Sequence, residues 1–381
     1  MKYFDYAATC PLDEEAAQIF VKASQNFFGN TQSLHDTGST AAALLEQCRL
    51  KLSQLLKVEK EGIFFTSGGS ESNFLAIHAL LSATRKKGRH IIAGLAEHSS
   101  IHSSLMRLEK DGCEISYLPF NKDGIIDLEK LQDAIREDTV LITIQHANPE
   151  IGTIQPIEEI GLLCKQNEIL LHSDCVQTFG KITLDNLIKW ADSFSISSHK
   201  FYGPKGVGAV YVNPYLAWKT FYPAAVHEKG FRPGTVNVPG IAAMVAAAEK
   251  SYANQTDYTK KFLKLRDAFK HSIKEISDRI TIHEANDPDM QLPSIIGLRL
   301  HGLEGQWVML ECNRRGFAIS TGTACQIGLQ SPSKTMQALG IDNKEAKEFI
   351  RISVGRETTE KDVESLGQTL VEIARQASVK S

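Results

Sequence analysis

The residues that could do chemistry lie in four short segments, and the first of them surrounds Lys200. In SISSHKFYGPKGVGAVYV, Ser197, His199 and Lys200 directly follow an apolar run that is typical of a strand. Ligands of open α/β sheets bind beyond the carboxyl ends of the strands. A lysine at such a place can form a Schiff base with a carbonyl compound. The alternative is an ordinary solvated loop lysine, which is the commoner environment for this residue type.

The second segment, ILLHSDCVQTFGK, places Asp174 at the end of an apolar run and Gln177 three residues later. An acidic side chain at a strand end can pair with a protonated pyridine nitrogen, and it can equally cap a helix. The pair Glu97 and His98 follows the run RHIIAGL in the same way. His98 could stack on a ring or lie on the surface.

The third segment, GIFFTSGGSESNFLAIHALL, is typical of a strand, a glycine turn and a helix. The turn contains Gly68 and Gly69 between Ser67 and Ser70. Amides at the N-terminus of a helix, together with its dipole, can hold a phosphate. The segment contains neither a GxGxxG motif nor a Walker lysine, and a plain connection between strand and helix is the alternative.

The fourth segment, AISTGTACQIGLQSPSKTM, surrounds Cys325 with small and polar residues in an expected loop between a strand and a helix. This setting suits a reactive thiol better than a core thiol, although a chance loop cysteine is the alternative. Cys10, Cys175 and Cys312 are interpreted as packing residues, because a small apolar thiol readily fills a buried site.

Composition excludes several classes of protein. The chain has 381 residues, 42 basic and 45 acidic side chains, and no block of basic residues that would favour nucleic acid or an anionic membrane. Seven cysteines without a C-x-x-C pair indicate neither a disulfide framework nor a zinc site. With no signal peptide and no apolar run of membrane-spanning length, the expected location is the cytoplasm.

The apolar pattern predicts an α/β protein with a mainly parallel sheet and crossover helices. An amphipathic helix is expected over residues 38–58, and a nearly unbroken helical stretch over 241–276. Beyond it, strands and helices near 294–300, 304–315, 317–320, 332–339 and 349–354, with a final helix, predict a smaller α+β unit. The strands expected in the larger sheet are residues 62–65, 89–95, 114–120, 139–145, 169–174, 192–197 and 207–212.

Taken together, these segments resemble the cysteine desulfurases of the NifS and IscS type, which are class V aminotransferase-like enzymes of the fold-type I pyridoxal-phosphate group. The resemblance runs in register over nearly the whole chain and includes a Gram-positive NifS-like subgroup. It implies an N-terminal arm of residues 1–15 joining the small domain, a cofactor-binding large domain of 16–255 with a seven-stranded sheet, and a small C-terminal domain of 256–381. The matching motifs are DYAAT-P, GN…SLH, FTSGGSESN-LAI, EH, H-N-EIGT-QPI, HSD-VQ-FGK, S-SHK-YGPKGVGA-YV, HEKG-RPGT-NVPGI, the Cys325 loop and IRIS-GR-TT.

The resemblance also implies roles for single residues. Lys200 resembles the lysine that binds pyridoxal 5'-phosphate covalently, and Asp174 the partner of its pyridine nitrogen. Gln177 resembles the donor to the ring hydroxyl, and His98 the catalytic histidine that stacks on the ring. The residues expected at the phosphate and elsewhere on the cofactor are Gly69, Ser70, Asn148, Ser197, His199 and Thr235.

Thr235 resembles a residue that reaches across from a second subunit, which implies a homodimer. Arg351 resembles the arginine that clamps the substrate carboxylate, a task suited to its planar fork. Asn30 is expected to contact the substrate as well.

The implied reaction converts L-cysteine to L-alanine. Cys325, as a thiolate, attacks the substrate sulfur and retains it as a persulfide, which passes to an acceptor protein. That acceptor is an iron–sulfur scaffold, a sulfurtransferase or a dedicated recipient enzyme, so the pathways implied are iron–sulfur cluster assembly and the thiolation of cofactors or tRNA. The seven-residue spacing to Pro332 resembles the group with a longer cysteine loop. The alternatives are a selenocysteine lyase or aminotransferase of the same fold, and a non-catalytic binding platform.

Two places depart from the family pattern. Pro149 stands where the family usually has a second asparagine, and proline offers no side-chain hydrogen bond. Ala224, Ala225 and Val226 stand where a run of glycines is usual, which predicts a less flexible backbone there.

Overall fold

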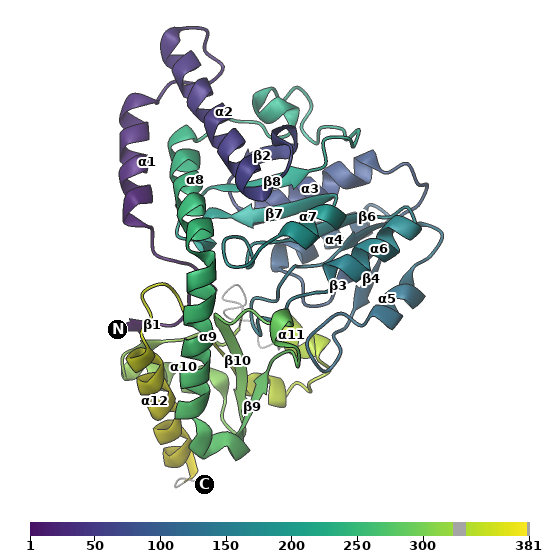
Figure 1. Ribbon diagram of the computed structural model, residues 1–381. Helices are drawn as coiled ribbons and strands as arrows, with labels where there is room; N and C mark the ends of the chain where they lie inside the picture. The colour runs from purple at the N-terminus through teal and green to yellow at the C-terminus, as the bar shows by residue number, and fades with distance from the viewer. Residues whose placement is uncertain (323–332, 379–381) are drawn as a thin grey trace.

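The computed structural model describes residues 1–322 and 333–378, and its largest element is the expected seven-stranded sheet (Figure 1). The strands follow the order β2-β8-β7-β6-β5-β3-β4, and all run parallel except β8, which is antiparallel to both neighbours. The predicted mainly parallel sheet is therefore confirmed. The strands are β2 (Ile63–Thr66), β3 (His90–Gly94), β4 (Glu114–Leu118), β5 (Thr139–Thr143), β6 (Leu170–Asp174), β7 (Ser193–Ser197) and β8 (Gly208–Val212).

Alternate residues of these strands face two separate apolar layers. Ile92 and Ile142 join one buried cluster, whereas their neighbours Ile91 and Leu141 join another. Successive side chains of a strand point to opposite faces, and a parallel sheet buries both. The cluster with Ile91 also includes α3 (Gly69–Ala83) and α4 (Ser99–Lys110), while α6 (Ile157–Gln166) and α7 (Asp185–Trp190) contribute to the other. The short helix α5 is Leu128–Ala134.

Three long helices, α1 (Glu14–Asn26), α2 (Asp36–Leu56) and α8 (Val238–Ala253), pack together beside this sheet. The last of them continues toward the second part of the molecule. The helices α1 and α2 pack along α8. Only Asn254 separates α8 from α9 (Gln255–Ser272), so the two helices run on from one part of the molecule to the other (Figure 1). The expected helical stretch thus contains two helices, and its last residues form a 3-10 turn, Lys274–Arg279.

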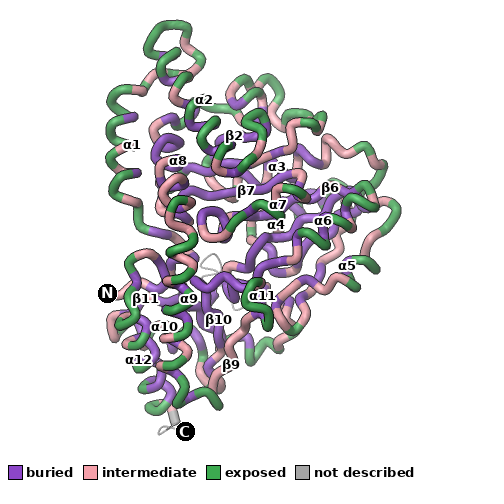
Figure 2. Tube along the Cα trace, viewed as in Figure 1, coloured by how far each residue is buried: buried purple, intermediate pink, exposed green. Residues whose placement is uncertain are grey.

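The second part contains a three-stranded antiparallel sheet in the order β12-β10-β9. Its strands are β9 (Ile280–His283), β10 (Ile295–Leu300) and β12 (Phe349–Ser353), and its helices are α9, α10 (Gly305–Arg314) and α12 (Glu360–Ser378). The strand β9 is not among those expected from the sequence, and all four of its residues are only partly buried (Figure 2). The short helix α11 is Lys334–Ala338.

The N-terminus joins this second part. The strand β1 (Lys2–Tyr3) pairs in parallel with β11 (Phe317–Ala318), so the first residues of the chain contact some of the last. The domain boundaries at 15/16 and 255/256 remain predictions. Other short 3-10 helices are Lys60–Gly62, Ser198–Lys200, His227–Gly230, Pro288–Met290 and Glu345–Glu348.

Within residues 1–322 and 333–378, no helix has both the length and the apolar character that crossing a membrane requires.

A buried ion pair fixes the segment that contains the HEKG motif. The Glu228 carboxylate accepts hydrogen bonds from Arg49 at 2.8 and 3.0 Å and from the Phe65 amide at 2.7 Å. Glu228 and Ala224 have φ of 46° and 65°, in the left-handed region that non-glycine residues rarely adopt. The ion pair therefore holds Glu228 in a left-handed backbone conformation within this segment.

Replacing Glu228 with Gln should lower the free energy of unfolding by about 3 kcal/mol, because the buried Arg49 guanidinium loses its carboxylate. Chemical denaturation followed by circular dichroism measures the loss. Glu46→Gln is the matched control, since Glu46 contacts the same arginine at 3.0 Å with a side chain that is 54% exposed. The control should lower the free energy of unfolding by less than about 1 kcal/mol. Equal losses in the two variants would contradict the argument that burial makes the Arg49–Glu228 pair important.

Candidate active site

A cavity of about 280 Å³ lies at the carboxyl ends of the parallel strands. His98 follows β3, Gln145 follows β5, and Asp174 and Ser197 end β6 and β7, so four strands direct polar residues to one place. The predicted site residues that line the cavity are Gly69, Ser70, His98, Asp174, Gln177, Ser197, His199, Lys200 and Arg351.

The remaining predicted site residues do not line this cavity. The Asn148 side chain is buried elsewhere, accepting from the amides of Glu150 and Ile151 and donating to Thr335 at 3.0 Å. Asn148 therefore holds a turn, and the structure does not bring its amide to the position expected for a cofactor contact. Asn30 and Thr235 are exposed in loops of the same chain. Cys325 lies outside the described residues.

The Lys200 amine points into the cavity and is held by the N-terminal arm. Its Nζ donates to the carbonyl oxygens of Ala7 at 2.6 Å and Ala8 at 2.8 Å. Burial, together with the positive charges of Arg351 and Lys181, lowers the pKa of Lys200 to about 8. The amine therefore loses its proton and becomes nucleophilic at a lower pH than an ordinary lysine does.

A chain of buried polar side chains fixes the Asp174 carboxylate. Its Oδ2 accepts from Asn73 Nδ2 at 2.8 Å, and its Oδ1 accepts from the Val176 amide at 2.9 Å. Asn73 in turn pairs with His172 Nε2 at 3.1 Å, and the other ring nitrogen of His172 contacts Ser193 at 2.7 Å. Each carboxylate oxygen keeps acceptor capacity for a further donor inside the cavity.

His98 lies at the start of α4 and is oriented by its own helix. Its Nδ1 accepts from the Ser100 amide at 3.2 Å and contacts the Ser100 hydroxyl at 2.8 Å. Burial lowers its pKa, while Asp174 acts in the opposite direction. Because Nδ1 accepts the amide proton, Nε2 carries the hydrogen of the neutral ring.

Beside the cavity, the N-terminus of α3 opens into a second hollow that shares four of its lining residues. No side chain caps α3 among the residues described, so its first amides are available to an anion. Gly68, with φ of 150°, forms the turn into the helix. His199 contacts Thr9 at 3.0 Å, and burial lowers its pKa to about 4. The hollow is lined by Thr9, Ser67, Gly68, Gly69, Ser70, Glu71, Ser197, His199, Lys205 and Gly206.

Gln177 is held at both ends of its amide. Its Nε2 donates to the Ala7 carbonyl at 3.0 Å, and its Oε1 accepts from Lys181 Nζ at 3.2 Å. The lysine thereby sets which way the amide points, with its nitrogen on the side of the N-terminal arm.

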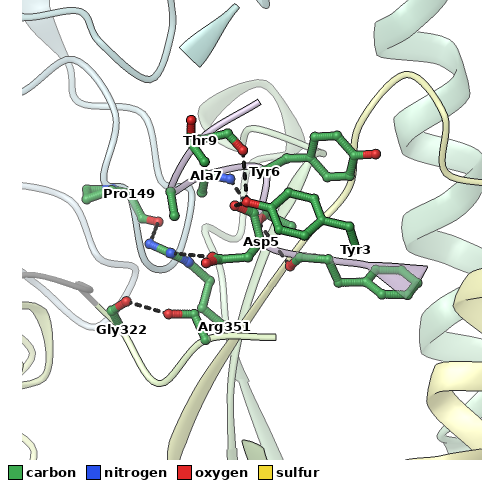
Figure 3. Close-up of polar contacts among 12 residues, drawn as sticks. Tyr3, Asp5, Tyr6, Ala7, Thr9, Pro149, Gly322 and Arg351 are labelled. Atoms are coloured by element: carbon green, nitrogen blue, oxygen red, sulfur yellow. Dashed lines mark hydrogen bonds and ion pairs between the residues drawn. The ribbon is translucent and has the colours of Figure 1, made fainter. Parts of the chain in front are cut away.

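Arg351 lies on β12 and reaches the cavity from the second part of the molecule (Figure 3). Its Nη1 donates to the Pro149 carbonyl at 3.0 Å, and its Nη2 to Asp5 Oδ1 at 2.7 Å. Its backbone pairs with Ser320, three residues before the segment that the structure leaves undescribed. Residue 149 thus meets the arginine through its backbone carbonyl, a contact that proline preserves.

The cavity fits pyridoxal phosphate. The uncapped N-terminus of α3, the fixed Asp174 carboxylate and Lys200 all contribute to the lining of this cavity. This donor set matches a phosphate, a pyridinium nitrogen and an aldehyde, respectively.

Several residues that shape the site have no prediction from the sequence. Asp5, Ala7 and Ala8 belong to the DYAAT motif. This motif contributes to the family resemblance, but the resemblance assigns no role to these three residues. Asn73 follows the predicted glycine turn by four residues, and this spacing of one helical turn was a usable signal. Lys181 follows Gln177 with the same spacing.

Burial disfavours the thiolate at every cysteine that the structure describes. It is the main cause of a raised pKa at each of these thiols, whereas a nucleophilic cysteine needs a lowered pKa. They are Cys10, Cys48, Cys113, Cys164, Cys175 and Cys312.

Comparisons with known proteins agree on one family. The aminotransferase class-V family model matches residues 2–366. A NifS protein of Bacillus subtilis (strain 168) is 47% identical over 369 residues, which cover 97% of this chain and 93% of the relative. The cysteine desulfurase IscS of Dictyoglomus turgidum is 37% identical over 362 residues, which cover 95% of this chain and 91% of that relative.

Solved structures show the same similarity. A NifS-like protein matches with a TM-score of 0.89 and 30% identity, over 98% of this chain and 99% of that protein. The structure of SspA in complex with cysteine matches with a TM-score of 0.77 and 30% identity, over 93% and 99% of the two chains.

Lys200 of the cofactor-free protein should react with an acylating reagent half-maximally near pH 8, because only the neutral amine is nucleophilic and its pKa is lowered to about 8. Labelling between pH 6 and 11, quantified by peptide mass spectrometry, measures this midpoint. Peptides with surface lysines such as Lys57 calibrate the reagent. A midpoint near the ordinary value of 10.5 would contradict the effect of burial.

Proposed function

The chain belongs to the aminotransferase class-V family, and we propose that it is a pyridoxal-phosphate-dependent cysteine desulfurase that converts L-cysteine to L-alanine. The observation that carries the proposal is the meeting of Lys200, Asp174 and Arg351 around one cavity. Such a set combines covalent attachment, electron withdrawal and recognition of a carboxylate. Relatives named as cysteine desulfurases, over nearly the full length of both chains, support the choice of substrate.

Each described residue has a task in this reaction. Bound pyridoxal phosphate supplies an electron sink for the negative charge that develops at the substrate Cα. Lys200, with a pKa of about 8, takes the α-proton and returns a proton to the product. Asp174 would hold a proton on the ring nitrogen of the bound cofactor, and His98 would lie against its ring. Arg351 binds the carboxylate of the amino acid.

The substrate sulfur passes to Cys325. Its thiolate attacks that sulfur, the carbon–sulfur bond breaks, and the products are alanine and a persulfide on the enzyme. Support for this choice comes from the sequence around Cys325 and from the six other cysteines, whose burial disfavours the thiolate. An acceptor protein of iron–sulfur or thio-cofactor metabolism then receives the sulfur.

We propose further that the enzyme is a homodimer. Thr235 is exposed and does not line the cavity of its own chain, as expected for a residue that completes the site of a partner. The strained segment held by the Arg49–Glu228 ion pair leads directly to Thr235. In this arrangement the ion pair sets where one subunit contacts the phosphate of the other.

Cys325→Ala should abolish alanine formation from cysteine, because no other nucleophile receives the sulfur. After incubation with L-cysteine, mass spectrometry of the wild-type protein should place one added sulfur on the Cys325 peptide. Cys175→Ala is the control, with activity within about twofold, since this thiol is buried and its pKa raised. Alanine formation that survives Cys325→Ala, or sulfur found on Cys175, would contradict the proposal.

Thr235→Ala should weaken cofactor affinity about tenfold, the value of one hydrogen bond to a charged phosphate. The molecular mass by light scattering should stay at twice 42.1 kDa. Fluorescence titration of the cofactor-free protein measures the affinity. Thr40→Ala, another exposed threonine whose hydroxyl donates to the Asp36 carbonyl, is the control and should bind as the wild type does. Equal affinities in all three proteins, or a monomeric mass, would argue against the shared site.

A further inference from the structure

The N-terminal arm places a carboxylate against the arginine of the cavity (Figure 3). Asp5 Oδ1 lies 2.7 Å from Arg351 Nη2, and the two side chains are 21% and 3% exposed. A guanidinium buried to this degree requires a compensating anion. Among the residues described, Asp5 is the carboxylate that forms an ion pair with it.

The position of Asp5 is fixed by its own backbone. Asp5 forms a parallel β-bridge with Ser353, two residues after Arg351. Its carbonyl accepts from the Ala8 amide at 2.9 Å and from the Tyr3 hydroxyl at 2.9 Å. These backbone contacts hold the Asp5 carboxylate in place beside the arginine.

Asp5 contacts the Arg351 guanidinium at Nη2 and is not itself one of the residues that line the cavity. Arg351 and Pro149 do line it. Asp5 and the Pro149 carbonyl each take one N–H of the guanidinium, at Nη2 and Nη1, whereas Nε is buried and has no partner among the described residues. The second N–H of each terminal nitrogen therefore remains for another carboxylate.

We propose that Asp5 is a positioning residue for the reaction, which fixes the Arg351 guanidinium so that its remaining donors meet the substrate carboxylate. The proposal rests on the function proposed above, since the second carboxylate is that of the amino acid. Asp5 stays in place when substrate binds, and the arginine contacts two carboxylates.

The same ion pair affects the Lys200 amine. The positive charge of Arg351 lowers the pKa of Lys200, and Asp5 partly cancels that charge. Asp5→Asn should therefore lower the pH at which the lysine–cofactor linkage loses its proton. The charged and titratable groups that face Lys200 are Arg351, Lys181, Cys10, Asp174, His98 and His199.

The experiment compares Asp5→Asn with Asp13→Asn in the cofactor-loaded enzyme. Asp13 is also a carboxylate near the N-terminus in an arginine ion pair, with Arg356 at 3.1 Å, and it caps α1, a task that asparagine performs equally well. Asp5→Asn should raise KM for L-cysteine on the order of tenfold, with kcat within about threefold. The midpoint of the pH titration of the cofactor's visible absorption band should fall. Asp13→Asn should match the wild type in both, and Asp5→Glu should keep the midpoint near the wild-type value.

Two results would overturn the proposal. A lower KM in Asp5→Asn would mean that Asp5 competes with substrate for the arginine. An unchanged KM together with an unchanged midpoint would mean that Asp5 only tethers the arm. If the wild-type enzyme forms no alanine from cysteine, the proposed function fails instead, and the spectral midpoint then decides whether Asp5 sets the charge of Arg351. Bound cofactor and the thermal midpoint of the cofactor-free variants, measured in parallel, separate these effects from loss of folding.

Discussion

The site depends on the compensation of positive charge inside a largely buried cavity. Lys200 and Arg351 both line it, and Lys181 lies close enough to affect the same amine. Burial makes each cation costly unless a partner satisfies it. The structure supplies those partners as carbonyl groups for Lys200, an amide oxygen for Lys181 and one carboxylate for Arg351. The positive charge that remains favours an anionic cofactor and a substrate that carries a carboxylate.

The parallel sheet and the N-terminal arm share the work of placing these groups. The sheet directs Asp174 and Ser197 to one edge, because parallel strands end on the same side. The arm crosses that edge and provides the acceptors that the strands lack. Arg351 comes from a different sheet, so the cavity requires both parts of the molecule to be in contact.

The sequence predicts most of the fold because the strands of the large sheet are short apolar runs with both faces buried, a pattern that is visible in one dimension. It fails for β9, whose residues are only partly buried and give no continuous run. Motif resemblance identifies nine of the residues that line the cavity. It fails where a backbone carbonyl acts, as at Ala7, since any residue type can provide one. The sequence also does not reveal that the Asn148 amide holds a neighbouring turn.

The pairing of the first residues with the last ones also sets the order in which the enzyme can be built. Lys2 pairs with Phe317 and Asp5 with Ser353, so the arm has no place to dock until the ribosome has made nearly the whole chain. At about 5–20 residues per second, the interval between synthesis of Lys200 and Ser353 is on the order of 10 s. During that time the lysine lacks the carbonyls that hold it and the arginine that tunes it. The cavity of a single chain can therefore be completed only after β12 has been made.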